Sequence, residues 1–306
     1  MADMTATLPT SGPPVVPLEG DLRGRRDDTR DRPPGCFAAG VSRGGVADHD
    51  HSNHAPLLPV PAVIEVRSLT KRYGPERKAV DGLTFTAPAG RVTGFLGPNG
   101  AGKTTTFRCL LGLAAPTSGE ALIDGRPYRE LPSPRRQVGA VLESIGFHPA
   151  RRGRDHLRVL ARSAGLDGRR IDAVLDTAGL GDAAGRPVGG YSLGMRQRLG
   201  LAGALLGDPP VMVLDEPANG LDPEGVRWVR RLLRVWADEG RTVLVSSHQL
   251  AEIAQVVDRV VIVRDGVAVV ETELTRPSSV ATLEALFLAA TGDDDEATDE
   301  AEEVRS

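Results

Sequence analysis

The chain has 306 residues, of which 40% are hydrophobic, so it can form one large or two medium domains with a substantial core. Its net charge of −4 is uneven, because both ends are acidic and residues 63–292 carry about +5. That central part lacks the dense basic stripe with interleaved aromatic residues that is typical of nucleic-acid binding. Two cysteines cannot build a disulfide framework, and apolar runs such as Val211–Leu214 are too short to cross a bilayer.

Composition divides the chain into three parts. Residues 1–62 are rich in Pro, Gly, Asp and Arg and show no sustained period of 2 or 3.6 residues, which predicts a disordered N-terminal arm. Residues 291–306 contain eight acids and one arginine, which predicts a solvated, disordered acidic tail. Residues 63–290 are therefore expected to form the folded domain.

Hydrophobic periodicity within the folded domain predicts an α/β fold with a helical insertion. Short strands are expected at residues 64–66, 84–86, 91–96 and 121–123, with a helix over residues 105–113. Apolar residues at i, i+3, i+4 and i+7 predict helices between residues 150 and 190. Three more apolar runs separated by helices are typical of a parallel sheet covered on both faces: 211–214, 243–246 and 260–263.

A glycine-rich loop of the pattern G-x-x-x-x-G-K-[ST] lies between the strand at 91–96 and the helix at 105–113. Its glycines let backbone N–H groups face anionic oxygens, and the helix adds the positive end of its dipole. Lys103 is expected to reach the β- and γ-phosphates of a nucleotide, and Thr104 to offer its hydroxyl to Mg²⁺. The predicted nucleotide-binding residues here are Gly97, Pro98, Asn99, Gly100, Ala101, Gly102, Lys103, Thr104 and Thr105.

Two acids end the apolar strand Val211–Leu214. Asp215 is expected at the carboxyl edge of the sheet beside the phosphate loop, where it would bind Mg²⁺. Glu216 would lie closer to the γ-phosphate and orient the attacking water. An isolated Asp-Glu pair after a strand more often begins a helix, but its combination with the phosphate loop favours a catalytic role.

The octapeptide at residues 191–198, Tyr-Ser-Leu-Gly-Met-Arg-Gln-Arg, resembles the signature sequence of ATP-binding cassette (ABC) proteins. Downstream, Asp222 ends a segment that resembles the D-loop of this family, and His248 resembles its switch histidine. Tyr73, thirty residues before Lys103, resembles the aromatic residue that stacks on adenine. The resemblance covers about residues 63–275, with the motifs in the family's order.

The resemblance implies a P-loop NTPase parallel sheet core with an antiparallel β-subdomain and a helical signature subdomain. It also implies an ATP-dependent homodimer in which Ser192 and Gly194 bind the ATP of the partner, although Ser192 alone reads as a helix N-cap. Lys103, Glu216 and His248 would be catalytic, and the cofactors would be ATP and Mg²⁺. The expected partner is a separate membrane permease on whose cytoplasmic side the subunit docks, and no nucleic acid is expected.

Two departures from the usual family pattern stand out. Tyr191, Leu193 and Met195 replace the commonest signature residues, whereas the phosphate-contacting Ser192 and Gly194 remain. Glu143 stands where most members have a glutamine that senses Mg²⁺ and contacts the transporter, and a glutamate resembles the branch that exports peptide antibiotics and drugs. Glu143 is thus the predicted coupling residue, with a surface glutamate in a shifted loop as the alternative.

The resemblance thus implies an ATP-binding and ATP-hydrolysing subunit of a bacterial ABC transporter that energises export through the permease. Other functions account for fewer of these features. The ATPase head of a chromosome-maintenance or repair protein would need a long coiled coil between Lys103 and Ser192, and only 89 positions separate them. A translation-associated protein of this family would carry two cassettes in tandem. A small-molecule kinase with a phosphate loop leaves the signature and His248 unexplained.

Overall fold

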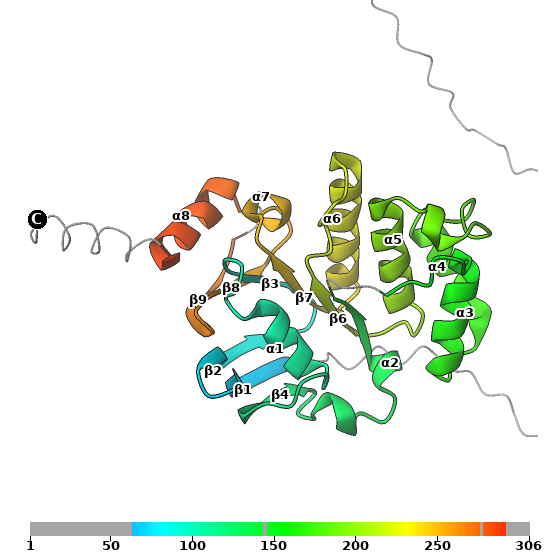
Figure 1. Ribbon diagram of the computed structural model, residues 1–306. Helices are drawn as coiled ribbons and strands as arrows, with labels where there is room; N and C mark the ends of the chain where they lie inside the picture. The colour runs from blue at the N-terminus through cyan, green and yellow to red at the C-terminus, as the bar shows by residue number, and fades with distance from the viewer. Residues whose placement is uncertain (1–62, 143–145, 276–277, 292–306) are drawn as a thin grey trace, which may run out of the picture. The chain divides into compact units, whose positions relative to one another are not determined.

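The structure is a computed structural model that describes residues 63–142, 146–275 and 278–291 (Figure 1). The predicted N-terminal arm, most of the predicted acidic tail and the predicted coupling residue Glu143 lie outside the described residues. None of the helices within these three ranges is both long and apolar enough to span a membrane.

A three-stranded antiparallel sheet forms the first layer, in the order β2-β1-β4. Ile64 of the central strand pairs with Ala87 on one side and with Ile123 on the other. Ile64 and Val66 are buried while intervening residues are more exposed, as expected for a sheet with one face against the core. Its strands are β1 (Ile64–Tyr73), β2 (Arg77–Ala87) and β4 (Ser118–Ile123).

A six-stranded sheet in the order β5-β6-β7-β3-β8-β9 forms the second layer, and only β9 runs antiparallel to its neighbour. Every residue of β3 and of β6 is buried, which explains their continuous apolar runs. The carboxyl ends of β3, β6 and β7 are adjacent, so the segments that follow them meet at one edge. The strands are β3 (Val92–Leu96), β5 (Val138–Val141), β6 (Val211–Asp215), β7 (Thr242–Ser247), β8 (Arg259–Arg264) and β9 (Val267–Glu273).

Helices cover the sheets and build the insertion expected from the 3.6-residue period. Helices α3, α4 and α5 pack against one another beside the edge strand β5 (Figure 1). The helices are α1 (Lys103–Leu110), α2 (Pro134–Gln137), α3 (Gly153–Ser163), α4 (Ile171–Thr177), α5 (Leu193–Ala204), α6 (Pro223–Asp238), α7 (Leu250–Ile253) and α8 (Val280–Thr291). The described residues also form short 3₁₀ helices at Tyr128–Glu130, Gly168–Arg170 and Val188–Gly190.

The helix after the phosphate loop begins and ends earlier than its predicted range of residues 105–113. It begins at Lys103, directly after Gly102, which takes the left-handed conformation with φ of 100°. It ends because Gly112 is also left-handed, with φ of 66°. The N–H of Gly112 then donates to the carbonyl of Cys109 and that of Leu113 to Arg108, which is a Schellman motif.

One buried histidine makes the stability of the helical insertion depend on pH. His156 of α3 is 6% exposed, its ring packs edge-on against Phe147, and its Nδ1 has no hydrogen-bond partner among the described atoms. Burial, helped by the positive charge of Arg151, lowers its pKa from 6.5. Below pH 6.5, His156 is therefore protonated in the unfolded chain while it stays neutral in the folded chain. The free energy of unfolding is highest above pH 6.5 and decreases as the pH falls.

We expect His156→Phe to flatten this dependence, because an aromatic ring that cannot be protonated fills a similar space. Denaturant unfolding at pH 7.5 and at pH 5.5 measures the free energies, and the variant should lose less stability between the two than the parent chain. Parallel losses in the two proteins would show that His156 is not the titrating group. For one proton, the loss of unfolding free energy that His156 causes cannot exceed about 1.4 kcal/mol per pH unit.

Candidate functional site

The shape of the phosphate loop is fixed by the conformations of its glycines and by hydrogen bonds from the side chain of Lys103. A Cβ on Gly102 would overlap the carbonyl oxygen of Ala79, and its φ of 100° also disfavours other residues. Lys103 is 7% exposed, and its Nζ donates to the carbonyl of Gly97 at 2.6 Å and to that of Pro98 at 3.2 Å. Helix α1 has no side-chain cap, so the N–H groups of its first turn remain available to an anion.

Asp215 joins the phosphate loop to the neighbouring strands. Its carboxylate is 1% exposed and accepts hydrogen bonds from the hydroxyl of Thr104 at 2.8 Å and from that of Ser246 at 2.6 Å. A hydroxyl and a carboxylate on adjacent elements form an oxygen donor set of the kind that Mg²⁺ prefers. The residues present therefore fit the predicted metal ion.

Glu216 and His248 form a polar pair beside this network. The Nδ1 of His248 lies 2.9 Å from Oε2 of Glu216, and Oε1 of the same carboxylate lies 3.8 Å from Nζ of Lys103. The Glu216 side chain is only 12% exposed, so its charge acts in a partly desolvated environment. Burial, with the negative charge of Glu216 as the next contribution, raises the pKa of Glu252 nearby.

The backbone of Glu216 is held in a conformation that non-glycine residues rarely adopt. Its φ is 51°, in the left-handed region, which costs roughly 1–2 kcal/mol. Its N–H donates to Oγ of Ser246 at 3.0 Å, and its carbonyl accepts from the N–H of Asn219 at 3.1 Å. This turn directs the carboxylate away from the strand axis and towards His248 and Lys103.

Ser246 was missed as a functional residue by sequence reasoning, which included it only as the last residue of the predicted strand 243–246. Its single hydroxyl donates to the Asp215 carboxylate and accepts from the Glu216 N–H. Two neighbouring parallel strands place Asp215 and Ser246 opposite each other in register. A serine at the carboxyl end of a buried strand is visible in the sequence and indicates a polar role. Its partner, Asp215, can be identified only once the order of the strands is known.

Tyr73 lies at the end of β1, and its side chain is exposed. The ammonium of Lys71 lies 5.0 Å from the centre of the ring, at a distance typical of a cation–π contact. Tyr73 pairs with Arg77, and two residues further along β2 the carbonyl of Ala79 lies against Gly102. The β1–β2 hairpin that contains Tyr73 thus contacts the phosphate loop at Gly102.

The signature residues lie at the start of α5, where they contact the D-loop segment. Ser192 is the N-cap of this helix, and its Oγ accepts from the N–H of Met195 at 3.2 Å. Gly194 lies against the side chain of Leu221. Asp222 is itself the N-cap of α6 and accepts from the N–H of Gly225 at 2.8 Å. These residues are grouped with one another, while Lys103, Thr104, Asp215, Glu216 and His248 form the other group.

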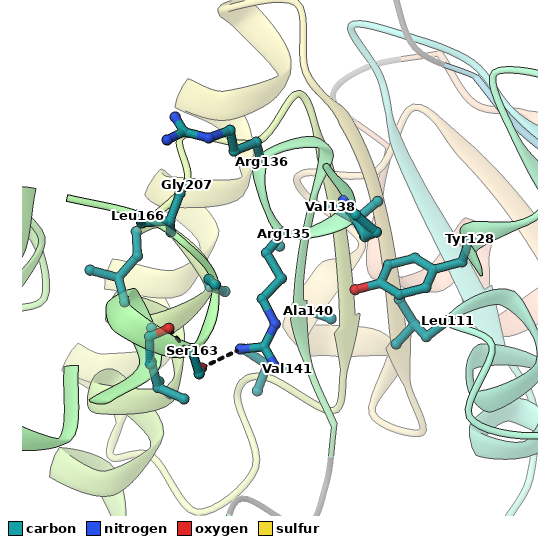
Figure 2. A pocket seen from close by; sticks show the side chains of 18 of the residues that line it. Leu111, Tyr128, Arg135, Arg136, Val138, Ala140, Val141, Ser163, Leu166 and Gly207 are labelled. Carbon is teal, nitrogen blue, oxygen red and sulfur yellow. Dashed lines mark hydrogen bonds between the residues drawn. The ribbon is translucent and has the colours of Figure 1, made fainter. Parts of the chain in front are cut away.

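A groove of about 780 Å³ lies beside the edge strand β5, on the side of the helical insertion. Figure 2 shows Arg135 of α2 reaching towards α3, where its Nη1 donates to Oγ of Ser163 at 3.3 Å. Apolar side chains make up much of its lining, including Leu111, Tyr128 and Val141. The groove continues to Leu142 and Gly146, which flank the predicted coupling residue.

Comparison with known proteins places this site in a family. A family model described as ABC transporter matches residues 80–219. The bacitracin transport ATP-binding protein BcrA of Bacillus licheniformis is 44% identical over 207 residues, which cover 67% of each chain. The chain belongs to the ABC transporter family. The lantibiotic transport ATP-binding protein SrtF of Streptococcus pyogenes is 35% identical over 213 residues, covering 69% of this ABC subunit and 91% of the relative.

Solved structures of ABC proteins share the fold. The structure of an ATP-binding subunit of an ABC transporter has a TM-score of 0.65 at 27% identity, covering 74% of this chain and 99% of that one. A dimeric ATP-binding cassette in a post-hydrolysis state with ADP and phosphate has a TM-score of 0.63 at 23% identity, covering 69% and 99%. The predicted fold class is confirmed, and so is the prediction of an ATP-binding, ATP-hydrolysing ABC subunit.

Proposed function

We propose that this ABC subunit hydrolyses ATP to drive export of a drug, an antibiotic or a peptide through a separate permease. The observation that carries the chemistry is the network in which Thr104, Asp215 and Ser246 hold Glu216 beside His248. The export assignment is supported by relatives named for bacitracin transport, lantibiotic transport and, at 39% identity, Nod factor export. The proposed place of action is the cytoplasmic face of the cell membrane.

The proposed chemistry needs few groups. Lys103 and the N–H groups of the loop bind the phosphates, and Tyr73 stacks on the adenine. Glu216 orients the attacking water and accepts its proton, while His248 holds the γ-phosphate through a hydrogen bond. Thr104 and Asp215 are the proposed holders of Mg²⁺, which supplies charge neutralisation on the phosphate oxygens.

The second proposed element is an ATP-dependent homodimer. Ser192 and Gly194 lie at the N-terminus of a twelve-residue helix, where backbone N–H groups and the helix dipole favour an anion. In the described chain their contacts run to Met195 and Leu221 rather than to the phosphate loop. We propose that they bind the γ-phosphate of ATP held by a second copy, with Asp222 lying at the interface.

The third proposed element is the contact with the permease. The groove beside β5 is lined by arginines as well as by apolar side chains, which suits an amphipathic helical segment with acidic residues. Glu143 lies outside the described residues, so its coupling role remains a proposal that is supported by its two flanking groove residues, Leu142 and Gly146.

A groove-filling variant tests the permease assignment. Ala140 is exposed on β5 and lines the groove, so Ala140→Trp should block docking and reduce export and co-purification of the permease by about tenfold or more. The matched control is Ala281→Trp on an exposed position of α8. Export by the complex in membrane vesicles, with ATP turnover of the isolated subunit as a check of folding, is the measurement. Normal export by Ala140→Trp would contradict docking at this groove.

A further inference from the structure

One face of α5 runs along the loop that contains Glu216. At its N-terminal end, a Cβ on Gly220 would overlap the side chain of Leu193, so the loop backbone lies directly against the helix. One turn further, the amide Nε2 of Gln197 donates to the carbonyl of Pro217 at 3.1 Å and lies 3.5 Å from that of Glu216. The signature helix therefore contacts the loop at both ends of this face.

Gln197 supplies hydrogen bonds where the loop itself has few donors. Pro217 has no N–H and is buried, so the turn that it enters has one fewer donor for its carbonyl groups. The two carbonyls point towards a single partly buried amide group. A carbonyl group in such a place needs a partner, because an unpaired buried acceptor is unfavourable.

The hydrogen bonds restrain a residue whose backbone is strained. Glu216 has a φ of 51°, and the turn stays in that region only if its surroundings hold it. Ser246 holds the N–H side of Glu216, and Gln197 lies on the carbonyl side. Loss of the Gln197 donor leaves the N–H of Asn219 as the contact on that side, so the turn is held less tightly and the carboxylate samples orientations away from His248.

We propose that Gln197 is a positioning residue that fixes the Glu216 carboxylate for attack and makes it move together with the signature. Ser192 and Gln197 lie on the same helix, five residues apart, so a shift of the helix end that meets the partner's ATP also shifts the turn at Glu216. The signature of one chain is thereby coupled to hydrolysis in the same chain. This inference rests on the proposed role of Glu216.

The first test compares side chains with and without a donor in the full-length protein. Gln197→Met keeps the length of the side chain and removes the donor, so kcat for ATP should fall by about tenfold. The dissociation constant for a non-hydrolysable ATP analogue should stay within about twofold, because Gln197 lies outside the phosphate loop. Gln197→Lys restores a donor and should return kcat to within about threefold of the parent. The control Gln255→Met changes an exposed glutamine elsewhere and should leave kcat unchanged.

The second test asks whether Gln197 acts through Glu216. Single-turnover hydrolysis is measured for Gln197→Met, Glu216→Gln and the double variant, and the double variant should be slowed by no more than about twofold beyond Glu216→Gln. Multiplying effects would overturn the proposal, as would an unchanged kcat in Gln197→Met or the absence of rescue by lysine. If Glu216→Gln alone retains normal turnover, the assignment of Glu216 fails instead, and the two failures are distinguishable.

Discussion

Replacement of Glu216 by glutamine is expected to slow ATP hydrolysis by about a hundredfold or more, while ATP binding is retained. The amide has the shape of the carboxylate but cannot accept the proton of the attacking water. The contacts that hold the turn, from Ser246 and Asn219, involve only the backbone of Glu216 and are preserved. Steady-state phosphate release and equilibrium ATP titration measure the two quantities on the same preparation.

Glu252→Gln is the matched control for this prediction. Glu252 lies near the Glu216–His248 pair, and burial followed by the charge of Glu216 raises its pKa, so its removal changes the local charge without removing the proposed base. Turnover by this variant should stay within about threefold of the parent. Glu216→Gln should also accumulate a dimer in size-exclusion chromatography with Mg-ATP. Persistent monomer together with normal hydrolysis would contradict both the catalytic assignment and the dimer.

Local chemistry explains why much of the site could be predicted from the sequence. The phosphate loop depends on glycines and a lysine that are close along the chain, and its flanking strand and helix were predicted nearly at their observed positions. The buried parallel strands were predicted because both faces of each are covered, so their apolar runs are continuous. The helical insertion was predicted from the buried stripes of α3 and α4.

Features that depend on tertiary neighbours could not be predicted in the same way. The strand β5 was not predicted, because it is only four residues long and contains Gly139, which weakens a strand signal. The reason for this glycine is tertiary, since a Cβ there would lie 2.5 Å from the carbonyl oxygen of Ala204. The strand β9 was missed as well, because it is an edge strand with exposed Val267 and Val269. The contacts of Ser246 and Gln197 depend on elements that are far apart in the sequence.

The predicted site residues also fall into two groups, those that the structure brings together and those that it keeps apart. The structure brings Thr104, Asp215, Glu216 and His248 together around Lys103, as their positions after adjacent parallel strands predict. It leaves Ser192 in contacts of its own at the start of α5. A phosphate site shared between two copies would explain why one chain contains the phosphate loop and the signature without bringing them into contact. The binding role of the signature is a proposal that the dimer experiment tests.

Replacement of Lys103 by alanine is expected to abolish tight ATP binding. The ammonium is 7% exposed and lies inside the loop, held by the carbonyls of Gly97 and Pro98, so it is already oriented before any phosphate contacts it. Charge-assisted hydrogen bonds to two phosphates contribute on the order of 3 kcal/mol or more, which corresponds to about a hundredfold or more in the dissociation constant.

The measurement is titration of ATP into the purified full-length variant, with Lys78→Ala as the control. Lys78 carries the same charge but lies on β2 and pairs with Asp81, so its removal should leave the affinity within about twofold. Lys103→Arg separates charge from shape, because a planar guanidinium cannot occupy the space of a compact ammonium between two carbonyls. The affinity of Lys103→Arg for ATP should exceed that of Lys103→Ala by no more than about tenfold. If Lys103→Ala binds ATP as the parent does, the glycine loop is not the phosphate site, and the neighbouring Asp215 and Glu216 lose their proposed roles with it.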